Sequence, residues 1–145
     1  MPLQTGDIAP DFSAPDQRGL TRSLADYRGT YLLLYFYPKD DTPGCTTEAC
    51  AFRDIEKEMS DKIVIVGVSA DSVESHLKFA GKYKLPFTLL ADPERKIIDA
   101  YGANSMLFGK RTSFLIDPKG IIKKIYEKVD AAAHPKQVME DVMAF

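Results

Sequence analysis

The sequence predicts an α/β fold in which helices cover a mixed central sheet. Two continuous apolar runs, at residues 30–37 (TYLLLYFY) and 62–69 (KIVIVGVS), are typical of strands that are buried on both faces. Each run is followed by a segment with helical spacing of its apolar residues. Near the other end of the chain, two strand-like segments flank Pro118-Lys119-Gly120 and predict an antiparallel hairpin. Because the early strands alternate with helices and the late ones are joined by a turn, the sheet should be mixed.

The first helix is predicted from its start signals and its apolar stripe. Pro38 ends the first strand, and Thr42-Pro43 then provides an N-cap residue followed by proline at the first helical position. The apolar stripe repeats every three or four residues and comprises Ala49, Phe52, Ile55 and Met59. We therefore expect a helix that runs to about Met59 and packs this stripe against the sheet.

The remaining elements complete a recognisable order. Asp71 and Glu74 have the spacing of a capping box, which predicts a second helix through Tyr83. Further elements are expected as a strand at 88–90, a helix at 94–101, the hairpin strands at 112–117 and 121–127, and a helix at 134–144. This order is the one that a thioredoxin-like fold needs, and residues 1–28 form an N-terminal extension with a small hairpin. We expect residues 1–145 to form a single domain.

Charge and hydropathy exclude several functions. The net charge is −2 and the basic residues are scattered, so the chain lacks the basic surface of a nucleic-acid or anionic-membrane binder. No stretch approaches the roughly 20 apolar residues that span a bilayer. The first ten residues also lack the pattern of a secretory signal. We expect a cytoplasmic protein that binds neither nucleic acid nor membranes.

The two cysteines, Cys45 and Cys50, are too few for a disulfide scaffold. In a reducing compartment, such a close pair indicates catalysis or metal binding. Zinc takes about four ligands, and the other soft ligands, His76 and His134, lie on distant segments. We therefore favour catalysis and expect neither a metal nor a cofactor.

Cys45 is the better candidate for a nucleophile because it falls in the first turn of the predicted helix. Unpaired backbone N–H groups and the helix dipole at this position favour negative charge, and so the reactive thiolate. Asp40 and Asp41 oppose this effect, so we expect a cation from another part of the fold. The alternative is that Cys45 is an inert, buried thiol.

The spacing of Cys50 from Cys45 has a mechanical consequence. Five residues along a helix place the two Cα atoms about 8–9 Å apart. A disulfide needs less than about 7 Å, with Cβ atoms that converge. If this is a redox pair, the first turns of the helix must unwind after Cys45 is oxidised. The alternative is that Cys50 is a small core residue.

The segment YFYPKDDTPGCTTEAC resembles the peroxiredoxin active-site pattern P-x-x-x-T-x-x-C, matched by Pro38, Thr42 and Cys45. The C-x4-C spacing is similar to that of the bacterioferritin-comigratory-protein/PrxQ subfamily of atypical two-cysteine peroxiredoxins. The resemblance extends over nearly the whole chain through the segments GDIAPDFSAPDQ, GVSADS, LPFTLLADP and RTSFLIDPKG.

The resemblance implies a role for each matched residue. Cys45 would be the peroxidatic cysteine and Cys50 the resolving one. Thr42 would hydrogen-bond the peroxide, and Pro38 would shield the pocket from water. Arg111, at the head of TSFLID, would lie against the thiolate and supply the missing cation.

The resemblance also implies an activity and partners. The chain would reduce hydrogen peroxide and organic hydroperoxides through a sulfenic acid and an intramolecular disulfide. Thioredoxin or a glutaredoxin-like dithiol would reduce that disulfide, and the protein would be a monomer. Glu48, on the same helix as Cys45, is expected to anchor Arg111.

Two features depart from some relatives. Residues 101–111 (YGANSMLFGKR) look shorter than the corresponding loop of many family members, which affects peroxide access and the partner surface. The chain also lacks the GGLG and C-terminal YF elements of relatives that are inactivated by excess peroxide, so we expect resistance to overoxidation.

Two other functions fit a pair of cysteines on this fold. A thioredoxin-like disulfide reductase would carry C-x-x-C and a proline before the facing strand, whereas this chain has C-x4-C and Lys110-Arg111. A redox-sensing or holdase module would use the same cysteines without turnover. Peroxide consumption with a reductant separates both from a peroxidase.

Overall fold

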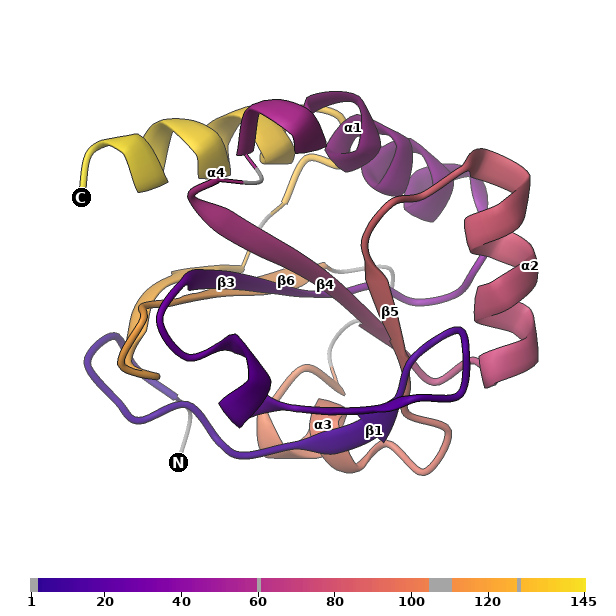
Figure 1. Cartoon of the computed structure of the whole chain (residues 1–145), viewed down its shortest axis with the longest axis horizontal. Coiled ribbons are helices and arrows are strands. Elements are labelled where there is room, and N and C mark those ends of the chain that lie inside the picture. Colours follow the sequence, from indigo (N-terminus) through magenta and orange to yellow (C-terminus); the bar gives the residue numbers. More distant parts are fainter. Residues whose placement is uncertain (1–2, 60, 105–110, 128) are drawn as a thin grey trace.

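The computed structural model describes residues 3–59, 61–104, 111–127 and 129–145, and shows the predicted mixed sheet (Figure 1). The central strand is β3 (Tyr31–Phe36). Its parallel neighbour is β4 (Ile63–Ser69), which pairs in turn with β5 (Thr88–Ala91). On the other side, β6 (Thr112–Ile116) and β7 (Ile122–Tyr126) add antiparallel pairs, giving the order β5-β4-β3-β6-β7.

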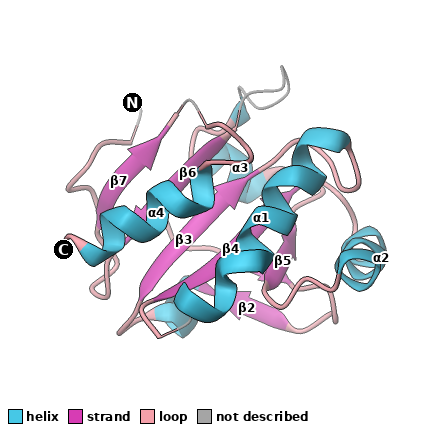
Figure 2. Cartoon of the chain, turned by 90° about the horizontal axis from the view of Figure 1, so that it is seen from above, coloured by secondary structure: helices cyan, strands magenta, loops and turns pink. Residues whose placement is uncertain are grey.

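Helices flank this sheet on both faces and at one edge. The helices α1 (Pro43–Met59) and α4 (His134–Met143) lie side by side on one face (Figure 2). The short helix α3 (Lys96–Ala100) lies on the opposite face (Figure 1). The helix α2 (Val73–Tyr83) packs against β5 at the edge. The thioredoxin-like arrangement is therefore confirmed, with α1 placed over the centre of the sheet.

The N-terminal extension covers the face opposite α1, beside α3 (Figure 1). Its predicted hairpin is present as β1 (Ser13–Pro15) paired with β2 (Thr21–Ser23). A 3-10 helix, η1 (Leu24–Tyr27), follows and was not predicted. The carboxylate of Asp26 accepts a hydrogen bond from the Ser23 amide at 2.8 Å, which fixes the start of this turn.

Strand β3 separates two hydrophobic cores because its side chains alternate between the faces. Three side chains pack with the N-terminal extension and α3, namely Leu32, Leu34 and Phe36. The next core, under α1 and α4, contains Leu33 and Tyr35, continues at Tyr37 and includes Cys45. The predicted burial of this strand on both faces is confirmed. Cys45, a candidate catalytic residue, belongs to the core under α1 and α4.

The apolar stripe of α1 faces the second core as predicted. Ala49 and Phe52 are fully buried, and Ile55 packs against the same cluster at partial exposure. The side chain of Met59 lies outside the described residues. The other predicted elements agree with the observed bounds to within two residues.

The predicted capping box of α2 is wrong. The cap is Ser72, whose hydroxyl accepts a hydrogen bond from the amide of Ser75 at 3.1 Å. The carboxylate of Asp71 instead accepts from the amide of Asp40 at 2.8 Å and from the hydroxyl of Ser69 at 2.7 Å. Asp71 therefore joins the segment between β4 and α2 to the loop before α1, a contact that the sequence pattern does not reveal.

Candidate active site

The loop between β3 and α1 places Cys45 in the first turn of a helix. The amide of Thr46 donates to the carbonyl of Thr42 at 2.8 Å, so the helix begins where the sequence predicts. The Thr42 hydroxyl donates to the carbonyl of Lys39 at 2.9 Å and stabilises the turn that precedes the helix. Pro38 is half-buried at the end of the strand and Thr42 is half-buried at the helix start.

The structure brings Arg111 against Cys45, although 66 residues separate them in the chain. Nη1 of Arg111 donates to the Cys45 sulfur at 3.2 Å. The register explains this contact, because Thr112, the first residue of β6, pairs with Phe36, the last residue of β3. Arg111 therefore lies where β3 ends and the loop to α1 begins. A guanidinium at this distance stabilises a thiolate through a charge-assisted hydrogen bond.

Glu48 lies one turn farther along α1 and contacts the same guanidinium. Its Oε1 is 3.3 Å from Nη1 of Arg111, and the residue is fully buried. Burial raises the pKa of Glu48 to about 8, because desolvation outweighs the opposing effect of Arg111. Glu48 is therefore mainly protonated at neutral pH, so the positive charge of Arg111 remains available to the Cys45 sulfur.

Two buried polar atoms beside this pair have spare hydrogen-bonding capacity. Among the described residues, Oε2 of Glu48 and the hydroxyl of Tyr35 are the buried side-chain atoms without a partner. Burial is the main cause that raises the pKa of Tyr35 well above its usual value, with the nearby charge of Glu48 adding to it. The Tyr35 hydroxyl therefore stays protonated and presents a donor within the same core as Cys45.

Gly44 allows the guanidinium to approach the helix. A Cβ placed on Gly44 would overlap Nη2 of Arg111. This requirement was not predicted, because it depends on a side chain from β6 that the local sequence does not show. The glycine next to Cys45 is thus part of what lets Arg111 reach the sulfur.

Both cysteines of α1 are reduced in this structure. Cys45 is 1% exposed and Cys50 is half-buried, and neither takes part in a disulfide. The helix is continuous from Pro43 to Met59, so helix geometry places the Cα atoms of the two cysteines about 8–9 Å apart. The structure therefore has the arrangement in which Cys45 cannot bond to Cys50.

Asp40 and Asp41 were expected to oppose a thiolate, but each carboxylate is held by hydrogen-bonding partners from other parts of the fold. The Asp40 carboxylate lies 2.6 Å from Nδ1 of His76 and accepts from the hydroxyl of Tyr37 at 2.5 Å. The Asp41 carboxylate accepts from Lys82 at 2.8 Å. The buried contacts of Asp40 reduce the electrostatic penalty that this aspartate would impose on Cys45, whereas the exposed ion pair of Asp41 has little effect.

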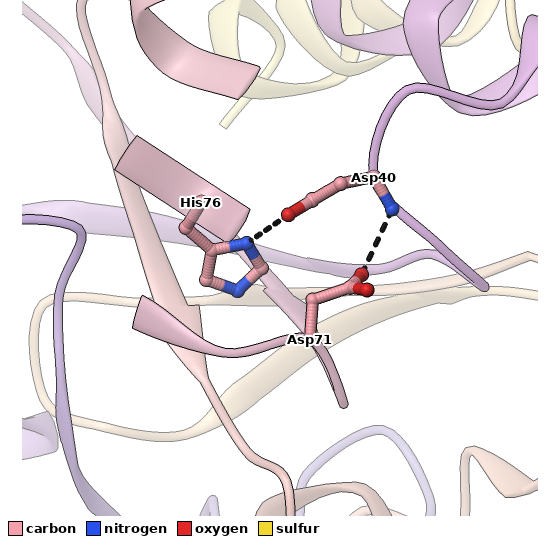
Figure 3. Close-up of side chains that lie close together, drawn as sticks. All are labelled: Asp40, Asp71 and His76. Carbon is pink, nitrogen blue, oxygen red and sulfur yellow. Dashed lines mark hydrogen bonds and ion pairs between the residues drawn. The ribbon is translucent and has the colours of Figure 1, made fainter. Parts of the chain in front are cut away.

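Asp40, Asp71 and His76 form a cluster that the sequence analysis missed (Figure 3). Their candidate ligand atoms all lie within 4.8 Å of one another. One signal could have found it. Asp40 and Asp71 each follow the carboxyl end of a strand, and the two strands are parallel neighbours in the sheet. The other histidine, His134, is buried elsewhere and contacts the hydroxyl of Ser113 at 2.9 Å.

The loop that is expected to be short, residues 101–111, is described only in part. Residues 105–110 lie outside the described part of the chain.

Within the described residues, no helix is both long enough and apolar enough to cross a membrane.

The pH dependence of the reaction with peroxide is expected to depend on Glu48. As the pH rises through about 8, Glu48 ionises and its negative charge cancels that of Arg111. The Glu48→Gln variant cannot ionise at this position. We therefore expect the ratio of the two rate constants for oxidation of Cys45, wild type over Glu48→Gln, to fall severalfold above this pH. Rapid-mixing measurements of thiol oxidation by hydrogen peroxide, from about pH 6 to 10, give this ratio. A ratio that is constant across this pH range would show that ionisation of Glu48 does not affect the reaction of Cys45.

A guanidinium held against a reduced cysteine at the start of a helix defines a thiol-based redox centre on a thioredoxin-like fold. Residues 5–125 match the AhpC/TSA family, and the chain belongs to this family. Its relatives make it a peroxiredoxin of the Bcp/PrxQ type, a thiol-dependent peroxidase.

The relatives match in sequence and in structure. The chain is 44% identical to peroxiredoxin Bcp of Bacillus subtilis, over 97% of this chain and 95% of that protein. It is 46% identical to chloroplastic peroxiredoxin Q of Triticum aestivum, over 86% of this chain and 59% of that one. The crystal structure of peroxidoxin BcpB from Mycobacterium tuberculosis superposes with a TM-score of 0.91 at 34% identity, covering 99% and 98% of the two chains. The bacterioferritin comigratory protein of Xanthomonas campestris, described as having alkyl peroxide reduction activity, gives 0.87 at 32% identity, covering 98% and 96%.

Proposed function

We propose that Cys45 is the peroxidatic cysteine and Cys50 the resolving cysteine of this peroxidase. The observation that carries the proposal is the position of the Cys45 sulfur, in the first turn of α1 and 3.2 Å from the guanidinium of Arg111. Of the two cysteines, only Cys45 combines a helix start with a cation. Hydrogen peroxide and organic hydroperoxides are the substrates.

In the first step, the Cys45 thiolate attacks the distal oxygen of the hydroperoxide. An S–O bond forms and the O–O bond breaks, so the sulfur loses two electrons and becomes a sulfenic acid. The leaving alkoxide or hydroxide takes up a proton and departs as an alcohol or water. Arg111 stabilises the negative charge that moves from sulfur to the leaving oxygen. The Thr42 hydroxyl binds the peroxide, and Pro38 keeps water from the sulfur.

In the second step, the Cys50 thiol condenses with the sulfenic acid, which forms a disulfide and releases one water. The beginning of α1 unwinds in this step, because an intact helix keeps the two sulfurs apart. A thioredoxin or glutaredoxin-like dithiol then reduces the disulfide by exchange and returns both thiols. The cycle leaves the protein unchanged and transfers two electrons from the dithiol to the peroxide.

The protein acts as a cytoplasmic monomer in this proposal. All residues assigned to the site come from one chain: from the loop between β3 and α1, from α1 itself, and from Arg111 directly before β6. Light scattering of the reduced and oxidised forms tests the oligomeric state, and a dimer in either form would contradict it.

Replacing Cys50 with serine tests the assignment directly. Cys50→Ser is expected to consume about one equivalent of peroxide per chain and then to stop, because its sulfenic acid has no internal partner. In wild type, the same treatment should give a mass two hydrogens lower, with the disulfide mapped to Cys45 and Cys50. Sustained turnover of Cys50→Ser with thioredoxin and its reductase would show that Cys50 is dispensable.

A further inference from the structure

A largely buried polar network ties the loop before α1 to the helix α2 and the residues that precede it. It consists of Tyr37, Asp40, Asp71, Ser75 and His76, and is called the Asp40 network below. The side chain of Asp40 is 4% exposed. Its carboxylate contacts the Tyr37 hydroxyl at 2.5 Å, the Ser75 hydroxyl at 2.8 Å and Nδ1 of His76 at 2.6 Å. Its amide donates to Asp71, as Figure 3 shows.

The carbonyl group of Leu90 shows where one proton of His76 lies. Nε2 of His76 lies 2.9 Å from the carbonyl of Leu90, which can only accept, so Nε2 carries a proton. Nδ1 then shares a second proton with the Asp40 carboxylate. Both ring nitrogens are thus engaged, and the ring has no free lone pair to offer a metal ion. The cluster is better explained as a structural tie than as a cation site.

The network acts on the segment that carries the reactive groups. Asp40 is two residues before Thr42 and five before Cys45, so fixing Asp40 fixes the entry to α1. Breaking a buried hydrogen bond leaves its partner unsatisfied and is costly, whereas an exposed ion pair contributes little. The neighbouring contact of Asp41 with Lys82 is of the exposed kind.

The same loop holds its backbone in an unfavourable conformation. Asp41 has a φ of 58°, in the left-handed region that residues other than glycine seldom adopt. Such a conformation persists only when the surrounding contacts hold it. The Asp40 network lies directly before this residue, so release of the network would also release the strain at the start of α1.

From this geometry we propose that the Asp40 network is a positioning device with two opposed effects. It holds the beginning of α1 in the conformation that reacts with peroxide, and it slows the unwinding that brings oxidised Cys45 to Cys50. The inference rests on the proposed roles of the two cysteines. Tyr37, Ser75 and His76 are then positioning residues, because they act on the reacting sulfur only through the loop.

The test removes single hydroxyl groups of the network and measures the two steps separately. Tyr37→Phe and Ser75→Ala each delete one hydrogen bond to Asp40 without adding volume. We expect each variant to slow the oxidation of Cys45 by hydrogen peroxide and to speed formation of the disulfide with Cys50, each by about fivefold. Rapid quenching after one equivalent of peroxide, with trapping of the sulfenic acid by dimedone and mass spectrometry, gives both rates.

The control is Lys82→Ala, which removes the exposed contact with the adjacent Asp41 and should change neither rate. Opposite changes of the two rates support the inference, because general destabilisation would lower the first rate without this pattern. Rates that stay the same or move together in both variants overturn it, provided that wild type forms the Cys45–Cys50 disulfide. A wild type without that disulfide overturns the assignment of Cys50, and the role of the network with it. Ser75 is only half-buried, so Ser75→Ala remains informative if Tyr37→Phe fails to fold.

Discussion

Replacing Cys45 with serine is expected to lower the rate of peroxide reduction by more than about a thousandfold. The Cys45 sulfur is the atom that receives oxygen, and a serine hydroxyl is neither ionised nor readily oxidised under the same conditions. The Arg111 guanidinium would remain in place without a nucleophile to stabilise. Steady-state consumption of hydrogen peroxide, with thioredoxin and its reductase as electron donors, measures the loss.

Cys50→Ser is the matched control, since it makes the same chemical change on the same helix. It should retain the first oxidation at nearly the wild-type rate, whereas Cys45→Ser should lose it. Circular dichroism should show both variants folded, because serine and cysteine are similar in size. Multiple turnover by Cys45→Ser would overturn the assignment of the nucleophile.

The fold could be predicted because its signals are local. The apolar run that forms β3 and the turn at Pro118-Lys119-Gly120 each show one element without reference to the others. The order of the elements then limits the topology to few choices. The 3-10 helix η1 and the Ser72 cap of α2 were missed because each depends on a bond that several nearby residues could have made.

The candidate site was predictable only in part. The position of Cys45 in a first helical turn follows from Thr42-Pro43 alone. The contact with Arg111 was expected from a family resemblance, since the pairing of β3 with β6 cannot be read from either segment. The raised pKa of Glu48 depends on burial, which arises only after the helix packs on the sheet.

The Asp40 network consists of contacts that cannot be predicted from the order of residues along the chain. Asp40 lies in a polar stretch, KDDTPG, that is typical of an exposed loop, yet its side chain is 4% exposed. His76 lies on the buried face of α2, where a histidine could equally be an isolated core residue. Only the parallel pairing of β3 with β4 brings the two together, so the sequence shows the charge of Asp40 but not the buried hydrogen bonds that stabilise it.

Loss of the contact between Arg111 and Cys45 is expected to slow the oxidation of Cys45 by about a hundredfold. Arg111→Met keeps an apolar stem of similar length but deletes the donor to the sulfur and to Glu48. The rate constant with hydrogen peroxide, measured in single turnover, should fall while formation of the disulfide with Cys50 is affected much less. A normal first step in Arg111→Met would remove the guanidinium from the mechanism.

Gly44→Ala tests the same contact without touching the arginine. Its Cβ would overlap Nη2 of Arg111, which lies at the end of a flexible side chain and can move away at little cost to the fold. Alanine also favours the helix more than glycine does, so stability should be unchanged or slightly higher while the first step slows. Gly81→Ala in α2 is the matched control, because a Cβ there meets no atom within 4 Å, and it should alter stability alone. If Gly44→Ala and Gly81→Ala react equally fast with peroxide, the sulfur does not depend on where Arg111 lies. A selective loss in Gly44→Ala would instead show that the close approach of helix and guanidinium is what makes Cys45 reactive.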